Sequence, residues 1–426
     1  MKTLRPLLTV VWICLSLGAG LHPTGRLAAQ ESLCLDSCLQ WAVQNYPLVE
    51  QLQLIDRSRD YNIKNINTGY ILHANITAFG GYMEGLPDLS AMGMEVEPWR
   101  FAGILQVEQP IWDGGRIENQ KKIARAEAEV NKSAVEIKIA ELKEKVSEIY
   151  FGILLAQTQR EQLQLQTETL EQSLKTLQSA AKAGSAFTSD ADAVEVKLLQ
   201  TEQQGIQLRR SERAYRRMLS IFIGRTIPET TVLEVPAIVL RSGREFDNRP
   251  EMALFEHRKR LLDAYNPGAG EVLPRVSLQG MGLLTVPQLK MPNGGDWNHL
   301  LLGGINVSWP IGGRAYTMGV DKKRLKVEKD QVDREKESFE MGQRINLTRQ
   351  TELLAQWDEL IAYDDRIIDI LARRTRTLEA RYKNGVVPIA DWLQAVSEES
   401  AARQNKALHE IQKMMTSYQY NRELGY

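Results

Sequence analysis

A long-period internal repeat limits the fold of this sequence more than any other feature. The segment VEQPIWDGGRI begins at Val107, and the related segment VSWPIGGRAY begins at Val307. The echo continues along the chain at an offset of about 200 residues, for example from Asp190 to Asp391. Self-similarity at one fixed offset indicates that a single architectural unit was duplicated.

Each repeat has the same predicted order of elements: a first helix, two strands, a helix of about 70 residues and a last helix of about 35 residues. In the first repeat, 30–223, we expect a helix at about 35–66, strands at about 70–84 and 99–112, and long helices at about 113–182 and 188–223. In the second repeat, 247–426, we expect a helix at about 246–265, strands at about 271–285 and 298–311, and long helices at about 314–383 and 388–424. Residues 224–246 would link the two repeats.

The long helices carry a sustained heptad pattern, in which the core positions step alternately by four and three residues. In the first repeat the pattern runs through Ile149, Ile153, Ala156, Arg160, Leu163, Thr167, Leu170, Leu174 and Leu177. In the second it runs through Leu354, Trp357, Ile361, Asp364, Ile368, Leu371, Thr375, Leu378 and Tyr382. Such a pattern predicts a coiled-coil seam, and a helix of this length would span roughly 100 Å.

Stop and start signals surround the break between the two long helices of each repeat. Lys182-Ala183-Gly184 and Lys383-Asn384-Gly385 each place a cation in the last turn and a glycine just beyond it, as helix ends prefer. Thr188 can cap the following helix of the first repeat, and Pro388 can begin that of the second. Each repeat is therefore predicted to end in a helical hairpin with a tight tip.

The N-terminus has the order of a secretory signal. Lys2 and Arg5 precede an apolar run at 7–17, and small residues follow near Ala29, so we expect cleavage of residues 1–29 and export. Beyond this leader, no apolar run of the sequence is long enough for a membrane helix. That observation does not exclude membrane β-strands, which are short and only half apolar.

Composition and motifs argue against several classes of function. The chain has 53 basic and 54 acidic residues, so bulk charge gives no attraction to nucleic acid. We find no nucleophile elbow, no Gly-rich phosphate loop before a helix and no zinc-ligand spacing, and therefore predict no catalytic residue, no metal site and no cofactor. After cleavage Cys34 and Cys38 remain, and their spacing leaves both a disulfide and two buried thiols open.

The predicted strands alternate between apolar and polar residues. In the last strand Leu301, Ile305 and Val307 fall on one face, and Asn306 and Ser308 favour the other. Tryptophans lie near the strand ends, where interfacial aromatic residues sit in membrane barrels: Trp99, Trp112, Trp297 and Trp309. A soluble four-stranded sheet with tryptophans in its core is equally compatible with the strands alone.

Strands and helices together favour a membrane assembly. Four strands cannot close a barrel, and an open edge in lipid leaves backbone groups unsatisfied at several kcal/mol each. Several copies of the chain, each donating four strands, could close one barrel, and their long helices would continue it as a hollow cylinder. The predicted fold is thus mainly α with a membrane β part.

Four segments resemble the TolC family of outer-membrane efflux proteins: SLCLDSCLQWAVQNYPLVE, VEQPIWDGGRI, VSWPIGGRAY and RYKNGVVPIADWLQA. The resemblance covers nearly all of the mature chain, in order and in duplicate. It implies a homotrimer that shares a twelve-stranded β-barrel in the bacterial outer membrane, continued by an α-helical coiled-coil tunnel through the periplasm. The implied role is a passive duct for cargo delivered by a periplasmic adaptor protein and an inner-membrane pump or ABC exporter. A soluble periplasmic coiled-coil adaptor or scaffold is the alternative.

The same resemblance implies roles for residues near the hairpin tips. The family carries two acidic residues, one helical turn apart, at the periplasmic entrance of the tunnel; Asp391 matches the first, and Gln394 occupies the second place. Asp190 matches an acidic position of the first repeat, and Tyr382 has the place of a residue that helps lock the closed aperture. Alternatively, both aspartates are first-turn residues that the helix dipole favours.

Two further groups of residues follow from this assignment. The expected adaptor-docking tips are Gly184, Ser185, Ala186, Gly385, Val386 and Val387. The expected strand-to-helix turns contain Pro110, Gly115, Arg116, Pro310, Gly313 and Arg314. Nothing in the sequence specifies whether the cargo is a drug, a metal ion or a polypeptide.

Overall fold

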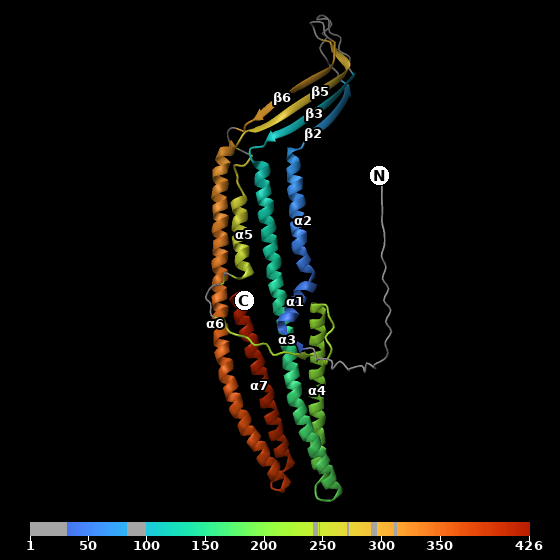
Figure 1. The fold of residues 1–426 in the computed structure, drawn as a ribbon, viewed down its shortest axis with the longest axis vertical. Coiled ribbons are helices and arrows are strands. Elements are labelled where there is room, and N and C mark those ends of the chain that lie inside the picture. Colours follow the sequence, from blue (N-terminus) through green and yellow to red (C-terminus); the bar gives the residue numbers. More distant parts are fainter. Residues whose placement is uncertain are drawn as a thin grey trace, which may run out of the picture.

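The molecule is elongated, with a β-sheet at one end and the tips of two helical hairpins at the other (Figure 1). The computed structural model describes residues 32–82, 99–241, 246, 248–270, 272–290, 296–310 and 313–426. The predicted signal at 1–29 lies outside the described residues.

Four antiparallel strands form the sheet in the order β2-β3-β5-β6. Their bounds are β2 His73–Tyr82, β3 Trp99–Trp112, β5 Arg275–Lys290 and β6 Asp296–Ser308. The register shifts between Pro110 and Trp112, where the proline cannot donate a ladder hydrogen bond. Each half of the chain thus supplies one strand pair, and β3 and β5 join the two pairs.

The register gives this sheet one largely apolar face and one face that mixes polar residues with apolar ones such as Phe79 and Leu302. Ile76, Leu105, Gly282 and Leu301 are aligned across the four strands on the apolar face. Large side chains on this face are exposed: Ile76, Phe101, Leu105, Leu278, Leu284, Leu301, Ile305 and Val307. The other face carries Asn75, Gln106, Glu108, Gln279 and Asn306. An uncovered apolar surface of this extent marks an interaction with lipid or protein.

Helices make up the rest of the molecule. Their bounds are α1 Leu35–Asn45, α2 Pro47–Asn67, α3 Arg116–Lys182, α4 Thr188–Ile223, α5 Pro250–Ala264, α6 Gly313–Lys383 and α7 Ile389–Glu423. A 3-10 turn at Thr68–Tyr70 and the short parallel strands β1 Ser32–Leu33 and β4 Val232–Leu233 complete the elements.

The single helix expected at 35–66 was wrong, because the chain breaks there into α1 and α2. Tyr46 is extended, with φ −80° and ψ 121°, and Pro47 is the first residue of α2. A residue before proline is disfavoured in the α region, so the Tyr46-Pro47 pair ends one helix and begins the next. Arg249 is likewise extended before Pro250, and α5 begins later than the expected position 246.

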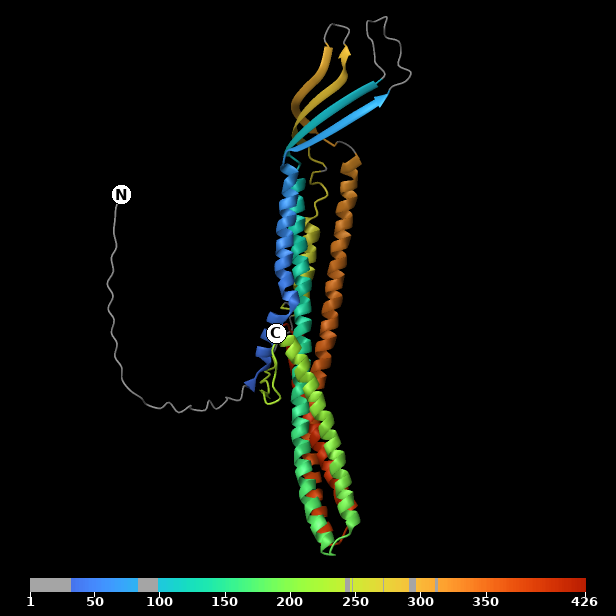
Figure 2. The same cartoon turned by 90° about the vertical axis from the view of Figure 1, so that its right-hand side faces the viewer.

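The four longest helices form two antiparallel hairpins, α3 with α4 and α6 with α7, and α3 also packs against α2, α5 and α7 (Figures 1 and 2). The largest core cluster lies where α1, α3, α4 and α7 meet. Within it the hydroxyl of Tyr150 donates to the carbonyls of Leu33 and Glu234, at 2.6 and 2.7 Å. Tyr150 therefore ties the paired strands β1 and β4 to the long helix α3.

The cysteines Cys34 and Cys38 are free thiols in this structure. Cys38 is fully buried in the same cluster, and burial raises the pKa of its thiol to about 12. A thiol with so high a pKa holds little reactive thiolate at neutral pH.

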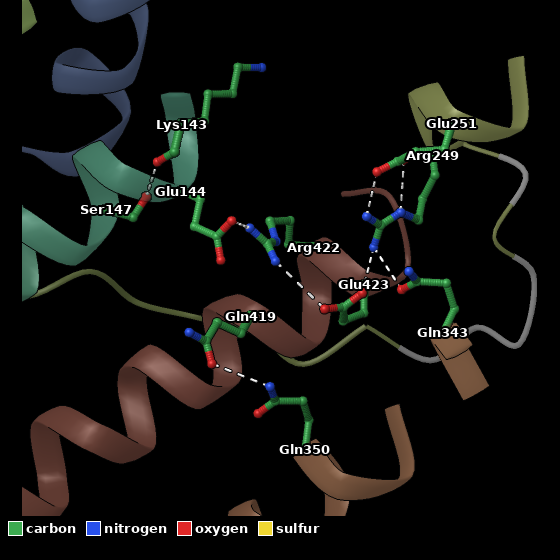
Figure 3. Close-up of polar contacts among 10 residues, drawn as sticks. All are labelled: Lys143, Glu144, Ser147, Arg249, Glu251, Gln343, Gln350, Gln419, Arg422 and Glu423. Carbon is green, nitrogen blue, oxygen red and sulfur yellow. Dashed lines mark hydrogen bonds and ion pairs between the residues drawn. The ribbon is translucent and has the colours of Figure 1, made fainter. Parts of the chain in front are cut away.

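A polar network joins the C-terminal end of α7 to three other helices (Figure 3). Arg249 at the start of α5 donates to Gln343 of α6 at 2.9 Å and pairs with Glu423 of α7. The neighbouring Arg422 pairs with Glu144 of α3. The network connects the second hairpin to the first, about half-way along the molecule (Figure 1).

Candidate functional site

The first helical hairpin closes through a left-handed glycine. Gly184 has φ 74° and donates to the carbonyl of Ala181 at 3.0 Å, while Ser185 donates to the carbonyl of Ala180 at 2.9 Å. These two bonds form a Schellman motif, which satisfies carbonyls that a helix end leaves free.

The second hairpin closes in the same way. Gly385 has φ 72° and donates to the carbonyl of Tyr382 at 2.8 Å, and Val386 donates to the carbonyl of Arg381 at 2.9 Å. Of the six tip residues, Gly184, Ser185, Gly385 and Val386 are exposed, and Ala186 and Val387 are partly buried. The two tips therefore present small side chains on the same backbone geometry.

Tyr382 connects the two hairpins just above these turns. Its hydroxyl donates to the Asp190 carboxylate in the first turn of α4, at 3.3 Å. Its ring stacks on that of Trp392, with centroids 6.3 Å apart and planes 9° apart. Burial, followed by the negative charge of Asp190, raises the pKa of Tyr382 to about 12. The phenol is thus held neutral, as a hydrogen-bond donor.

Trp392 is the buried centre of this contact, and sequence reasoning did not single it out. It is 2% exposed within a cluster that combines both hairpins: Leu170, Leu177, Ala191, Val194, Ile389, Trp392 and Val396. Its Nε1–H has no hydrogen-bond partner among the described residues. The seven-residue pattern places Tyr382 in the seam, but Trp392 lies in α7, where no such pattern had been assigned.

Asp391 and Gln394 do not join the Tyr382–Asp190 contact. Both side chains are exposed, and Asp391 lies in the first turn of α7. Gln394 donates to Glu398 at 2.9 Å, and Glu398 pairs with Arg374 of α6. Tyr382 and Asp190 therefore connect the two hairpins, whereas Asp391 and Gln394 are exposed to solvent in the single chain.

The first strand-to-helix turn is organised by Asp113, which sequence reasoning also missed. The Asp113 carboxylate accepts from the amides of Gly115 and Ile117, at 3.0 and 2.6 Å, as a capping carboxylate does at a helix start. Gly114 and Gly115 both have positive φ. The amide of Gly270 donates to the carbonyl of Gly114 at 2.9 Å, so the segment before β5 packs on the turn.

The other turn residues lie around these contacts. Pro110 marks the shift in register of β3, and Arg116 begins α3. A Cβ at Gly270 would lie 2.3 Å from the Cβ of Arg116, which explains a glycine there. In the second turn, β6 ends at Ser308, Pro310 follows two positions later, and Gly313 begins α6. Residues 311–312 and the side chain of Arg314 lie outside the described residues.

Among the described residues, no helix is long and apolar enough to cross a membrane. Within the same residues, His, Cys, Asp and Glu do not gather into a group of three that could hold a metal ion.

Comparison with known proteins finds a sequence family that the chain resembles. Residues 45–224 match the sequence profile described as "Outer membrane efflux protein". The chain thus resembles the outer membrane efflux proteins over these residues, which make up less than half of its length. No curated protein sequence matches it.

Solved structures share the fold of this protein over most of its length. A membrane protein from Pseudomonas aeruginosa superposes with a TM-score of 0.69 at 18% identity, over 92% of this chain and 90% of that one. The outer membrane protein VceC from Vibrio cholerae gives 0.66 at 12% identity, over 92% and 96%. The open state of the MtrE outer membrane channel from Neisseria gonorrhoeae gives 0.65 at 17% identity, over 92% and 88%. At these identities the likeness concerns the fold alone.

Proposed function

We propose that this protein is an outer-membrane efflux protein, the exit duct of a tripartite efflux or type I secretion system, and works as a homotrimer. Three copies would place twelve strands in one outer-membrane barrel and continue it as a helical tunnel through the periplasm. The observation that carries the proposal is the sheet itself. Its apolar face is uncovered, and β2 and β6 are edge strands with one neighbour each among the described strands.

The helices support the same assembly. One side of α4 exposes large apolar side chains along its length: Val196, Leu199, Ile206, Met218 and Ile221. Leu54 and Tyr61 of α2 are exposed as well, as are Val320, Val327, Met341 and Ile345 of α6. Such rows are costly in water and are covered when neighbouring copies pack side by side.

At the far end, the tips are the proposed docking surface for a periplasmic adaptor. The exposed Gly184, Ser185, Gly385 and Val386 would let a partner's helical hairpin approach closely. In a trimer, three Asp391 carboxylates would surround the entrance, with Asp190 holding the neighbouring hairpin. A ring of carboxylates attracts cations. An inner-membrane pump or ABC exporter would supply the cargo and the energy.

The mass of the purified particle tests this proposal. We expect protein extracted from outer membranes in a neutral detergent to have the mass of a trimer by light scattering, after subtraction of the detergent. Ile221→Glu, on the exposed row of α4, should shift the particle toward monomer, whereas Gln204→Glu, exposed on the same helix but beside the row, should not. A monomer that stays soluble without detergent would instead support a periplasmic coiled-coil adaptor or scaffold.

A further inference from the structure

We propose that a basic pocket directly below the sheet binds a phosphate-bearing anion, either an anionic lipid headgroup or a soluble phosphate compound. The pocket lies between α2, α3 and α5 and has a volume of about 740 Å³. This is within the usual range of ligand sites, roughly 300 to 1,000 Å³. The idea that the anion is a lipid headgroup depends on the proposed position of the sheet in the outer membrane. The existence of the pocket does not.

The charges that line the pocket do not cancel locally. Its acidic residues already have cationic partners: Asp60 pairs with Arg59 at 2.9 Å, Glu129 with Lys132 at 3.3 Å, and Asp263 with Lys329. Asp56 also lies 2.7 Å from both Arg59 and Lys132, so Asp60 and Glu129 share these two cations with it and are partly neutralised before a ligand arrives.

The remaining cationic side chains give the pocket an excess of positive charge. Lys122 of α3 and Arg260 of α5 line the pocket and make no ion pair or hydrogen bond within the described part of the chain. Arg125 has one distant partner, Glu118, at 3.8 Å. Three cationic groups from two helices thus border one pocket without a close anion. Guanidinium and ammonium groups together favour a phosphate, which accepts several charge-assisted hydrogen bonds at once.

The distance of the pocket from the sheet, measured along α3, suits the binding of a lipid headgroup. Lys122 follows the first residue of α3, Arg116, by six positions, or about 9 Å along the helix axis. Ala264, the last residue of α5, also lines the pocket. The headgroup region extends roughly 5 to 8 Å beyond the hydrocarbon, so a sheet that spans the hydrocarbon would bring the pocket close to the headgroups of the periplasmic leaflet. Basic pockets at this depth bind anionic headgroups in other membrane proteins.

Calorimetric titration of the full chain in a neutral detergent tests the site. The probes are dihexanoyl phosphatidylglycerol and inorganic phosphate, both at fixed ionic strength. We expect saturable binding of at least one probe and at least tenfold weaker binding to Lys122→Gln/Arg260→Gln. Lys121→Gln is the matched control, because Lys121 is adjacent, pairs with Glu118 at 3.6 Å and does not line the pocket. Its affinity should stay within twofold of the unmodified protein.

The two probes separate the two sources. Binding of phosphatidylglycerol alone assigns the pocket to membrane lipid, and binding of inorganic phosphate with similar affinity assigns it to a soluble anion. Lys122→Arg/Arg260→Lys keeps both charges and should retain binding even if the double glutamine variant assembles poorly. If neither probe binds to a particle that is trimeric and conducts ions, the proposed binding site is wrong and the proposed duct function still holds. An equal loss of affinity in Lys121→Gln and in the double glutamine variant would also contradict the binding site. Binding to a particle that does not conduct would keep the pocket and reject the duct.

Discussion

The hydroxyl of Tyr382, at the end of α6, donates a hydrogen bond of 3.3 Å to the Asp190 carboxylate at the start of α4. These residues belong to different hairpins, and their contact lies directly above the two tips. In the proposed trimer the contact holds the second hairpin against the first in each copy. A displacement of either hairpin must break it.

Tyr382→Phe should therefore favour an open entrance. The loss of one partly exposed hydrogen bond costs about 0.5 to 1.5 kcal/mol, which is roughly a 2- to 10-fold change in the ratio of open to closed states for each copy. Single-channel recording in planar bilayers should show longer or larger openings. Tyr363→Phe, on an exposed tyrosine of the same helix, should leave the currents unchanged. Equal currents for Tyr382→Phe and the unmodified protein would show that the Tyr382–Asp190 hydrogen bond does not hold the entrance closed.

The same contact predicts an alkaline transition. The pKa of Tyr382 is raised from an ordinary value of 10.0 to about 12, by burial and then by the charge of Asp190. A group with a raised folded-state pKa contributes stability that is fully present below its ordinary pKa and is lost as pH rises through the folded one. The stability that the contact contributes should be constant up to about pH 10 and fall between about 10 and 12, while the phenol of the folded protein ionises only near pH 12. The difference in tyrosinate absorbance between the unmodified protein and Tyr382→Phe should titrate with a midpoint near pH 12, and a midpoint near 10 would contradict the assignment.

Cation block at the entrance should follow the charge at two exposed positions of α7. Asp391→Asn should weaken the block of single-channel current by Mg²⁺, because it removes the proposed ring of three carboxylates. Gln394→Asp should strengthen the block, since it adds a second ring one helical turn away. Glu399→Gln serves as the control, because Glu399 pairs with Arg403 at 2.7 Å. An unchanged block in both entrance variants would place these residues outside the conduction path.

Much of the long-helix architecture could be predicted from the sequence because its signals are local. The Lys-x-Gly stops at 182–184 and 383–385 mark helix ends, and α3 and α6 both end at the lysine. Local signals also explain the errors. The expected helix at about 35–66 ran through the Tyr46-Pro47 step, which is a helix break. Strand β5 was expected to end at 285, although its backbone continues through Pro287 to Lys290.

Contacts between distant segments were beyond the sequence alone. Spacing cannot show that Asp190 meets a hydroxyl 192 positions later, that Arg422 pairs with Glu144, or that Trp392 is buried between hairpins. Tyr382 and Asp190 were expected to be functional residues only because the sequence resembles the TolC family at these positions. Asp113 is different, because an aspartate directly before Gly-Gly and a helix is a cap signal that can be recognised in the sequence.

Asp113→Ala should destabilise the strand-to-helix turn. It removes the acceptor for the amides of Gly115 and Ile117, and loss of a capping side chain costs about 1 kcal/mol. Thermal unfolding followed by circular dichroism should show a lower midpoint, with a smaller decrease for Asp113→Asn, which keeps one acceptor oxygen. Asp192→Ala, at an exposed position of α4, should leave the midpoint unchanged. Equal midpoints for Asp113→Ala and Asp192→Ala would show that the cap adds nothing.

Trp392→Phe should be tolerated far better than the removal of a buried tryptophan normally is. The indole Nε1–H lacks a partner among the described residues, and an unsatisfied buried donor costs roughly 1 to 3 kcal/mol; its removal offsets part of the packing lost with the smaller ring. Trp357→Phe is the comparison: Trp357 is partly buried, and its Nε1–H donates to Thr416 at 3.1 Å, a bond that would be lost. Thermal midpoints should therefore fall more for Trp357→Phe than for Trp392→Phe. The reverse order would mean that the packing lost around the buried Trp392 ring outweighs the hydrogen bond lost at the partly buried Trp357.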